Sequence, residues 1–420
     1  MGCDALYDAR LAISGKDVAL FDLATWKNGL AFKKIDFSDS GIPVIKIAEL
    51  NNGIGSSTSF TRGVYSSDVK LQRGDFLFSW SGNPETSIDI FRFELEEGWL
   101  NQHIFKTTPN SSLVTWDYFF YLMKWLKPVF KSIASNKQTT GLGHITISDL
   151  KKIKVTVPAK DFQDKVAAIL TAIDNKISLN AKLNGYLAEL QQAIYADSTK
   201  EGAQTTIGEI AEVIDCLHSK KPQRQPSGKP LIQLNNIIDD GILNMADTFY
   251  ISEDDYAKWI SRCEVKPGDC VITNVGRIGA VSQVPRGTTA AMGRNMTCIR
   301  PGAYAATVIT ALCSNAMRYE IEKRTDAGTI MNALNVRNIP KLEFYLPPAE
   351  VRDSVEATLK TIQDARELLL KERQEFAALR DALLPKLMSG EIDVSKIDLM
   401  QLNSHLAERR HSPLQLQDCR

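Results

Sequence analysis

The fold of this chain is decided by residues 162–194, which read FQDKVAAILTAIDNKISLNAKLNGYLAELQQAI. Apolar side chains recur in this stretch at alternating spacings of four and three residues, which is typical of a coiled-coil seam. The predicted helix is far longer than the average globular helix of about 11–12 residues. The predicted seam consists of Phe162, Val166, Ile169, Ile173, Lys176, Asn180, Leu183, Leu187, Leu190 and Ile194.

The same spacing returns 189 positions later, so the chain carries two matching seams. Two ordinary surface helices, each packed on its own domain, would be the simpler interpretation. The length, the shared register and the polar residues Lys176 and Asn180 favour a helix pair, because polar residues in a two-stranded seam can fix its register. The second seam consists of Val351, Val355, Thr358, Ile362, Ala365, Leu369, Glu372, Phe376, Leu379 and Leu383.

The sequence before each long helix is also duplicated. Arg73-Gly74-Asp75 leads into an apolar strand, as does Pro267-Gly268-Asp269, and a further strand ends at Pro158 or Pro347 before the helix. One unit, a globular domain followed by a long helix, is therefore written twice. Because domain termini usually lie close together, the second helix should begin near the end of the first and run antiparallel to it.

The predicted fold class is α+β. Two tandem α/β domains are joined by two long helices that form an antiparallel coiled coil with pseudo-twofold symmetry. The expected boundaries are residues 1–158 for the first domain, 159–198 for the first helix, 199–347 for the second domain, 348–390 for the second helix and 391–420 for a C-terminal tail.

Composition points to a water-soluble globular protein. Of the 420 residues, 44% are hydrophobic and 24% are charged, and no apolar run approaches the ~20 residues of a membrane span. The start of the chain does not resemble a secretory signal, and the seven cysteines are scattered without a C-x-x-C motif. We therefore expect reduced thiols, a cytoplasmic location, no membrane contact and no metal site. The formal net charge of zero does not decide for or against nucleic acid, since a local basic face is what binds DNA.

No catalytic centre is recognisable in the sequence. There is no glycine-rich phosphate-binding loop followed by a helix, and residues 274–279 (NVGRIG) are better explained as a strand and turn. The histidines His103, His144 and His218 are isolated from one another along the chain. The residues by themselves therefore predict a bivalent binding protein that is not an enzyme.

Several of these motifs together resemble the specificity subunit of type I restriction–modification systems. Residues 383–392 (LLPKLMSGEI) are very similar to the closing motif of that family, and residues 271–279 resemble its strand and turn. The resemblance runs from about Val18 to Ile392. It departs from the usual pattern at residues 79–83 (SWSGN), and residues 393–420 match nothing familiar.

The resemblance implies a division of labour. Each globular domain would be a target recognition domain that reads one half of a bipartite site in double-stranded DNA. The helices would set the spacer and carry two methyltransferase subunits, and motor-nuclease subunits would complete the complex. The chain itself would bind no cofactor, because S-adenosylmethionine, ATP and Mg²⁺ would be used by the partner subunits.

Candidate DNA contacts are the residues with long or forked polar side chains in corresponding loops of the two domains. Many of them would touch phosphate and carry no sequence information. A specificity subunit of a fused methyltransferase-nuclease system and a coiled-coil scaffold without DNA binding are the alternatives. The candidates are Lys27, Asn28, Lys33, Lys34, Asn136, Lys137, Gln138, Thr140, Lys220, Lys221, Gln223, Arg224, Gln225, Arg277, Arg294 and Arg324.

Overall fold

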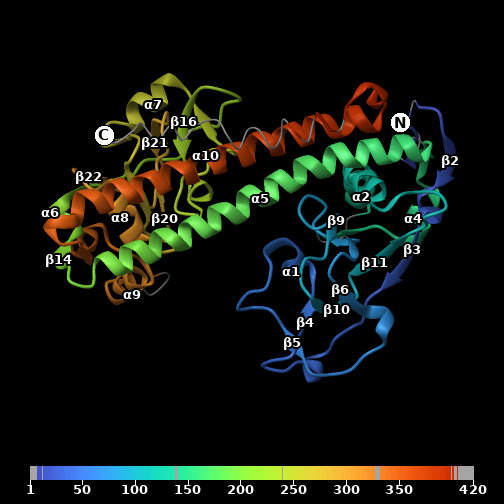
Figure 1. Cartoon of the computed structure of the whole chain (residues 1–420), viewed down its shortest axis with the longest axis horizontal. Helices are drawn as coiled ribbons and strands as arrows, with labels where there is room; N and C mark the ends of the chain where they lie inside the picture. Colours follow the sequence, from blue (N-terminus) through green and yellow to red (C-terminus); the bar gives the residue numbers. More distant parts are fainter. Residues whose placement is uncertain are drawn as a thin grey trace. The chain divides into compact units, whose positions relative to one another are not determined.

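The computed structural model describes residues 7–11, 13–137, 141–238, 240–326, 332–398, 400–401 and 404. The chain divides into two units, Met1–Lys176 with Ala377–Arg420 and Ile177–Phe376. Two long helices, α5 (Lys160–Ser198) and α10 (Ala349–Met388), each contribute a part to both units. The rest of each unit is a mixed α/β domain (Figure 1).

The first domain is built from short strands that pair into several small sheets. One four-stranded sheet has the order β3-β11-β7-β9, a second has the order β5-β4-β10-β6, and β13 pairs with β2. Its strands are β1 (Asp8–Ala9), β2 (Lys16–Ala19), β3 (Ala24–Asn28), β4 (Ile42–Ile45), β5 (Phe60–Thr61), β6 (Lys70–Gln72), β7 (Phe76–Ser79), β8 (Ser81–Gly82), β9 (Asp89–Arg92), β10 (Glu97–Leu100), β11 (Ile104–Pro109), β12 (Gly143–His144) and β13 (Lys154–Val157). Its helices are α1 (Ile47–Asn52), α2 (Trp116–Trp125), α3 (Lys127–Asn136) and α4 (Ile147–Lys152).

The second domain repeats this arrangement. Its two four-stranded sheets have the orders β15-β22-β19-β20 and β17-β16-β21-β18, and β23 pairs with β14. Its strands are β14 (Ala203–Thr206), β15 (Ala211–Asp215), β16 (Lys229–Ile232), β17 (Phe249–Ile251), β18 (Glu264–Val265), β19 (Cys270–Thr273), β20 (Val281–Gln283), β21 (Ala290–Met292), β22 (Met296–Pro301) and β23 (Glu343–Leu346). Its helices are α6 (Ile207–Ile210), α7 (Glu253–Trp259), α8 (Ala305–Leu312) and α9 (Asn315–Lys323).

The duplication extends to strand direction and to turn chemistry. β4 pairs with β10 in parallel, as β16 does with β21, while the other pairs of the matched four-stranded sheets are antiparallel in both domains. Gly74 and Gly268 have φ values of +95° and +91°, a region that glycine adopts without steric cost. The carboxylates that follow, Asp75 and Asp269, each accept a hydrogen bond from the backbone N–H three residues earlier. The α+β class and the repeated domain are therefore confirmed.

Each long helix begins shortly after a strand that is followed by a proline, Pro158 after β13 and Pro347 after β23. Gln163, in the first turn of α5, is fully buried. Its side chain accepts a hydrogen bond from the N–H of Thr115 (2.8 Å) and donates to the carbonyl oxygen of Pro158 (2.8 Å), so it fixes the start of the helix. At the same end of the antiparallel pair, α10 stops just before Gly390, which adopts a φ of +75°, the usual way in which a glycine ends a helix. Leu387 and Met388 are buried in this closing segment.

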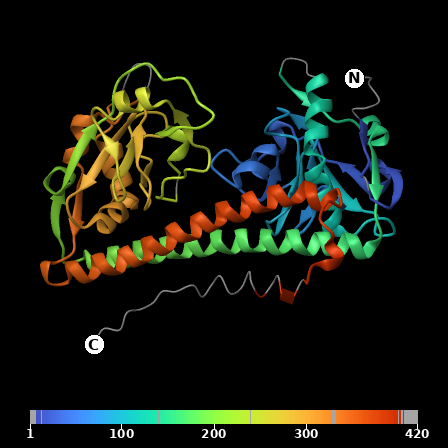
Figure 2. The same cartoon turned by 90° about the horizontal axis from the view of Figure 1, so that it is seen from above.

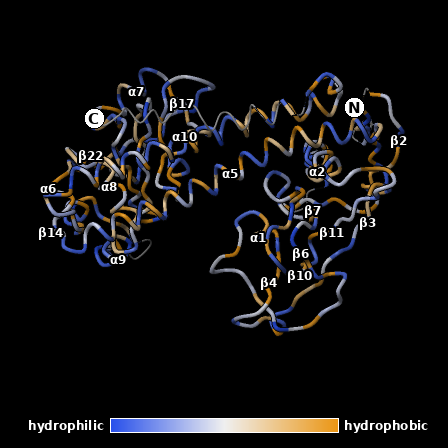
Figure 3. Tube along the Cα trace, in the orientation of Figure 1, coloured by the Kyte–Doolittle hydropathy of each residue, from blue (hydrophilic) through white to orange (hydrophobic). Residues whose placement is uncertain are grey.

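The helices pack against each other and run antiparallel in each unit. In the first unit Asp174 accepts a hydrogen bond from Arg380. In the second unit Asn180 contacts Glu372, and Gln191 contacts Gln363. Residue numbers rise along α5 as they fall along α10, which confirms the predicted antiparallel pairing. Figures 1 and 2 both show α5 and α10 side by side, and Figure 3 shows hydrophobic and hydrophilic residues alternating along them.

The seam differs from the predicted positions in the second half of α5. Val166, Ile169 and Ile173 are buried, but Leu183 and Leu190 are 40% and 48% exposed, as are Val351 and Leu379 to a similar degree on α10. The buried positions are instead Asn184, Gln191 and Tyr195. An α-helix has 3.6 residues per turn, so a straight helix drifts by about 20° per heptad away from a strict seven-residue seam. Over about three heptads this drift accumulates to roughly 60°, more than half of the ~100° between neighbouring residues, so it turns the inward-facing positions from 183, 190 and 194 towards 184, 191 and 195.

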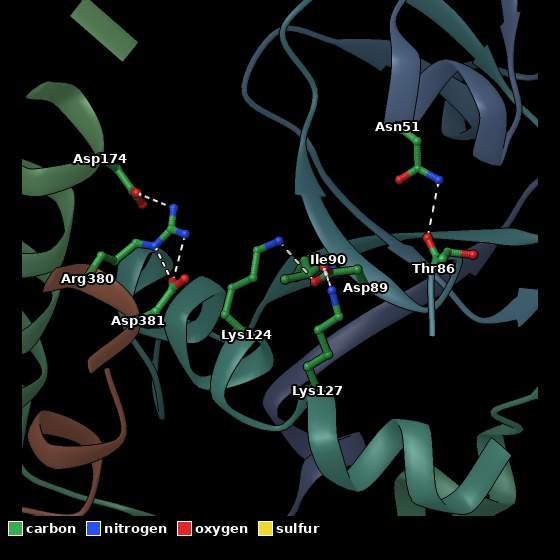
Figure 4. A network of polar contacts seen from close by, with 9 residues as sticks. All are labelled: Asn51, Thr86, Asp89, Ile90, Lys124, Lys127, Asp174, Arg380 and Asp381. Carbon is green, nitrogen blue, oxygen red and sulfur yellow. Dashed lines mark hydrogen bonds and ion pairs between the residues drawn. The ribbon is translucent and has the colours of Figure 1, made fainter. Parts of the chain in front are cut away.

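A polar network holds the end of α10 in the first unit (Figure 4). The Arg380 guanidinium donates to Asp174 on α5 (3.0 Å) and to Asp381 (2.9 Å). Burial opposes the charged form, but these two carboxylates raise the pKa of Arg380. The Tyr121 hydroxyl of α2 donates to the same Asp174 carboxylate (2.7 Å), so one carboxylate joins both long helices to the domain.

The same view shows how helices α2 and α3 are tied to the sheet (Figure 4). Lys124 and Lys127 both donate to the Asp89 carboxylate, at 3.0 and 2.6 Å, and Asn51 donates to the carbonyl oxygen of Thr86. Burial lowers the pKa of Lys124, while Asp89 acts in the opposite direction. Pro128 lies in the first turn of α3, where its missing N–H costs nothing.

Asp149 is a fully buried carboxylate that we expect to stabilise the first domain. It accepts hydrogen bonds from the Thr146 N–H (2.8 Å) and hydroxyl (2.6 Å) and from the Tyr7 hydroxyl (3.0 Å), and it forms an ion pair with Lys137. Burial alone would raise the pKa of Asp149, but these partners together lower it. A lowered pKa stabilises the folded state above the unfolded-state pKa of about 3.9, and this stabilisation is lost as the pH falls through the lower folded-state value.

Asp149→Asn is therefore expected to reduce the free energy of unfolding by about 2–3 kcal/mol at pH 7. The difference from the unsubstituted chain should shrink as the pH falls below about 4. Urea unfolding followed between pH 7 and pH 3 measures both effects. Asp161→Asn is the matched control, because that carboxylate is exposed and its removal should cost no more than about 1 kcal/mol. If the difference in the free energy of unfolding between Asp149→Asn and the unsubstituted chain did not change with pH, the stabilising role of the Asp149 carboxylate would be contradicted.

Among the described residues, none of the helices is both long and apolar enough to span a bilayer.

Candidate nucleic-acid interface

In the first domain, polar and aromatic side chains meet at one end of the sheet β3-β11-β7-β9. Asn28 ends β3, Trp80 follows β7, and His103 precedes β11, so antiparallel pairing brings all three together. The Trp80 indole N–H donates to Oδ1 of Asn28 (3.1 Å), and its backbone N–H donates to the carbonyl oxygen of His103 (3.3 Å). The Trp80 ring stacks on Phe105 with centroids 5.6 Å apart. Asn28 and His103 are exposed, so this end of the sheet presents hydrogen-bonding groups and a half-buried aromatic ring to solvent.

Lys27 lies in β3, and the other predicted contacts of the first domain lie in or beside two loops. Lys33 and Lys34 are exposed in the loop between β3 and β4, whose turn is held by a hydrogen bond from the Lys33 N–H to Asp36 (2.6 Å). Lys27 forms an ion pair with Asp68. The second loop follows α3. After it the chain lies beside Trp80 again, where the Ile145 N–H donates to the Trp80 carbonyl oxygen (2.8 Å).

That second loop contains four of the predicted residues. Asn136 is exposed at the end of α3, and Lys137 is engaged by Asp149. Gln138 and Thr140 lie outside the described residues.

The second domain has the same end of the sheet, built from different side chains. Asp215 ends β15, Asn274 follows β19, and Asn295 precedes β22. The Asn274 N–H donates to the Asn295 carbonyl oxygen (2.8 Å), and the Leu334 N–H donates to the Asn274 carbonyl oxygen (2.9 Å), which repeats the backbone contacts of Trp80. Asn295 has a φ of +64° and is exposed.

The predicted basic loop of the second domain, residues 220–225, is packed on Phe249. The Lys221 ammonium lies 4.4 Å from the centre of that ring, Arg224 forms an ion pair with Asp247 (2.9 Å), and the Gln225 N–H donates to the carbonyl oxygen of Tyr250 (2.9 Å). Lys220 and Gln223 are exposed.

This loop occupies the place of the first domain's lysine loop. Lys220 and Lys221 stand 187 positions after Lys33 and Lys34, the same separation as that between β3 and β15. The two lysine-bearing loops therefore occupy equivalent places in the two domains.

The remaining predicted arginines differ in what their side chains contact. Arg294 is exposed beside Asn295. Arg277 donates to the carbonyl oxygen of Ile237 (3.0 Å) and lines a cleft of about 660 Å³ together with Arg318. Arg324 is only 21% exposed and forms ion pairs with Glu320 and Glu343. Arg324 is therefore engaged inside the domain, whereas Arg294 lies at the end of the sheet described above.

One group of side chains near this end of the sheet has metal-binding chemistry. Among the residues that the structure describes, Asp215, Cys216 and His218 bring potential ligand atoms within 4.8 Å of one another. The Asp215 carboxylate is already paired with His218 (2.9 Å) and with the Arg262 guanidinium (3.3 Å). Burial raises the pKa of Cys216, which disfavours the thiolate that a metal would need. The group is therefore better described as an ion-pair cluster.

Four residues at this end of the sheet are not among the contacts predicted from the sequence: Trp80, His103, Asn274 and Asn295. Their positions in the repeat contained the signal, since Trp80 and Asn274 follow equivalent strands and His103 and Asn295 precede equivalent strands.

Known proteins with similar sequences and folds support one interpretation of this architecture. Residues 15–189 match the family described as the type I restriction modification DNA specificity domain. The putative type I restriction enzyme MjaX specificity subunit of Methanocaldococcus jannaschii is 22% identical over 410 residues, covering 88% of this chain and 91% of that protein. The type I restriction enzyme MjaVIII specificity subunit of the same organism is 22% identical over 385 residues, covering 85% of this chain and 87% of that protein.

A solved structure shares the fold. The crystal structure of the type I restriction–modification system S subunit from M. genitalium is 16% identical, with a TM-score of 0.56, and covers 90% of this chain and 96% of that chain. The resemblance predicted from the sequence is therefore confirmed: the chain is similar in sequence and in fold to specificity subunits of type I restriction–modification systems.

Proposed function

We propose that this chain is the DNA-recognition subunit of a type I restriction–modification complex, in which each globular domain reads one half of a bipartite double-stranded site. One observation carries the proposal: two domains whose four-stranded sheets have the same strand order present polar side chains and a lysine-bearing loop at equivalent places. Base reading needs such donors and acceptors within reach of a groove. The different exposed side chains at these places, His103 and Asn295 for example, would give the halves different sequences.

The two long helices would join the readers and carry the catalytic partners. Linking two modules makes the second contact effectively intramolecular, so two domains of modest affinity can bind tightly together. In the second unit, Leu183, Tyr186 and Leu190 form an exposed apolar stripe on α5. Such a stripe supports the docking of a methyltransferase subunit. S-adenosylmethionine would then belong to the two methyltransferase subunits, ATP and Mg²⁺ to the motor-nuclease subunits, and this chain would be non-catalytic.

The proposal is tested by the salt dependence of DNA binding. Duplex DNA releases counterions when a protein neutralises phosphates, and the slope of log K against log[salt] changes by about 0.9 for each phosphate contact. Substituting both Lys220 and Lys221 with alanine should therefore reduce the slope by about two in the complex assembled with methyltransferase subunits. The slope is measured by fluorescence anisotropy with a duplex that carries the site methylated by the complex.

Lys266→Ala is the matched control, because Lys266 is an exposed lysine of the same domain at the opposite end of β19. Its slope should be unchanged. If the assembled complex bound duplex DNA without salt dependence, or not at all, the rival interpretation of a coiled-coil scaffold would take the place of DNA recognition.

A further inference from the structure

In the second unit the contact between α5 and α10 is polar and is centred on Arg366. This side chain is only 6% exposed. Its guanidinium donates to Oε1 of Gln191 (2.7 Å) and to Oδ1 of Asn184 (3.2 Å), both on α5. A further hydrogen bond goes to Oε1 of Gln363 (3.3 Å), one turn earlier on its own helix. Two amides of the opposite helix thus enclose one buried cation.

Arg366 also contacts the globular domain. Its Nη2 donates to the carbonyl oxygen of Asp240, in the segment between β16 and β17. The same segment is held to α10 by an ion pair of Arg373 with the Asp240 carboxylate (3.4 Å) and by a hydrogen bond from Gln374 to Asn244 (2.8 Å). One side chain therefore touches both helices and the second domain.

Such a group adds little stability, because burying a guanidinium is costly. Burial lowers the pKa of Arg366, an effect that the nearby Cys313 and Asp240 partly offset. Replacing a buried ion with well-packed apolar side chains is often neutral or stabilising. What a buried polar group can supply is one preferred register, since other alignments leave it with fewer partners.

The alignment of the helices decides whether these partners are available. Sliding α10 along α5 by one heptad moves it by about 10.5 Å. Arg366 would then lose one of its two amide partners on α5 and the Asp240 carbonyl, and a buried cation would be left partly unpaired. An apolar side chain at position 366 would impose no such penalty.

We propose that Arg366 is a positioning residue that fixes the axial register of α10 on α5 and ties the second domain to that register. The register itself does not depend on the proposed function. Its consequence for DNA, a fixed spacer between the half-sites, does.

The test uses register reporters in the full-length chain. Asn180 and Glu372 are in contact (2.9 Å), so a cysteine pair at these positions reports the observed register. A cysteine at position 180 combined with one at 365 or at 379 would report shifts of one heptad in either direction. The reporter substitutions are therefore Asn180→Cys with Glu372→Cys, Ala365→Cys or Leu379→Cys. Oxidative cross-links are identified by peptide mass mapping, which separates them from links to native cysteines.

With Arg366 present, we expect cross-linking of the 180–372 pair alone. In the Arg366→Met background, the shifted pairs should cross-link at least roughly tenfold more than with Arg366, because hydrogen bonds to a charged group no longer select one register. Arg366→Lys, which keeps the charge but not the forked geometry, should give a smaller increase and serves if the methionine variant does not fold. Lys371→Met, on an exposed position of α10, is the control and should resemble the unsubstituted chain.

Absence of shifted cross-links in both Arg366 variants overturns the proposal, even if their thermal stability falls. The DNA consequence is read separately, by mapping methylated sites in cells that also express the methyltransferase subunit. Relaxed register with relaxed spacer length supports both proposals. Relaxed register with unchanged spacer and half-sites supports the role of Arg366 but contradicts the idea that the helix pair measures the site.

Discussion

Replacing residues 207–341 with the corresponding segment of a type I specificity subunit is expected to change one half of the modified DNA site and leave the other half intact. The exchanged segment begins directly after β14, and one residue separates its end from the start of β23, so the β14–β23 pair and both long helices stay unaltered. Both four-stranded sheets of the second domain lie wholly inside the segment. Recognition would therefore move as a complete module.

The contact of Arg366 with the exchanged domain should survive the replacement. Its acceptor is the backbone carbonyl of Asp240, which any residue at that position supplies. The helix pair and its register should thus be preserved, and the spacer should change little. Sequencing of methylated bases in cells that express the chimaera with its methyltransferase subunit measures both half-sites and the spacer.

The reciprocal exchange is the control. Replacing residues 20–153, between β2 and β13, should change the other half-site. If either chimaera altered both halves, the domains would not be independent readers. A chimaera that assembled with its partner but kept both original half-sites would place recognition outside the globular domains.

Much of this fold follows from the sequence because its signals are local and repeated. The heptad spacing predicts the two long helices, which the structure has at Lys160–Ser198 and Ala349–Met388. The glycine turns before β7 and β19 and the proline-terminated strands are also local features. Recurrence of each signal at a nearly constant separation then predicts that the domain is repeated.

The interior of the helix pair was less predictable for a physical reason. Apolar periodicity identifies which residues are hydrophobic, but which face turns inward depends on what lies opposite. Leu183 and Leu190 continue the apolar pattern, yet Asn184 and Gln191 are buried because Arg366 faces them and needs their amide oxygens. Nothing in the sequence of α5 alone reveals a buried cation on α10.

The candidate interface was also predicted in part. The lysine-bearing loops follow from composition and from the repeat, since Lys33 and Lys34 correspond to Lys220 and Lys221. Trp80, His103 and Asn295 join the interface only through strand pairing, which brings residues far apart in the chain to one end of a sheet. That information lies in the tertiary structure.

Inserting one heptad into each long helix is expected to lengthen the spacer between the half-sites without changing either half. The insertions belong after Ile177 in α5 and after Phe376 in α10, because contacts on either side, Asp174 with Arg380 and Asn180 with Glu372, show that these positions face each other. Duplicating the preceding heptad in each helix keeps the seam in phase. Seven residues add about 10.5 Å of helix, which is roughly three base pairs at about 3.4 Å per pair.

The rotation of DNA makes the expected result more specific. Three base pairs turn the duplex by roughly 100°, since a full turn takes about 10–10.5 base pairs. A heptad rotates the face of a helix by only about 20°. The longer site should therefore be modified, but more weakly than the original site is by the unaltered chain, because the DNA must twist or bend to present both halves.

A heptad inserted into α5 alone is the decisive control. With one helix longer than the other, only one side of the insertion can stay in register. Either Arg366 loses its alignment with Asn184 and Gln191, or Arg380 loses its alignment with Asp174. The helix pair should therefore lose stability, and DNA modification should fall sharply at every spacer length. If methylation mapping instead found an unchanged spacer length for the chain with both insertions, the helix pair would not measure the distance between the half-sites. A longer spacer with the paired insertion, and loss of modification with the single one, would mean that the two helices act as a ruler only while they are held in register.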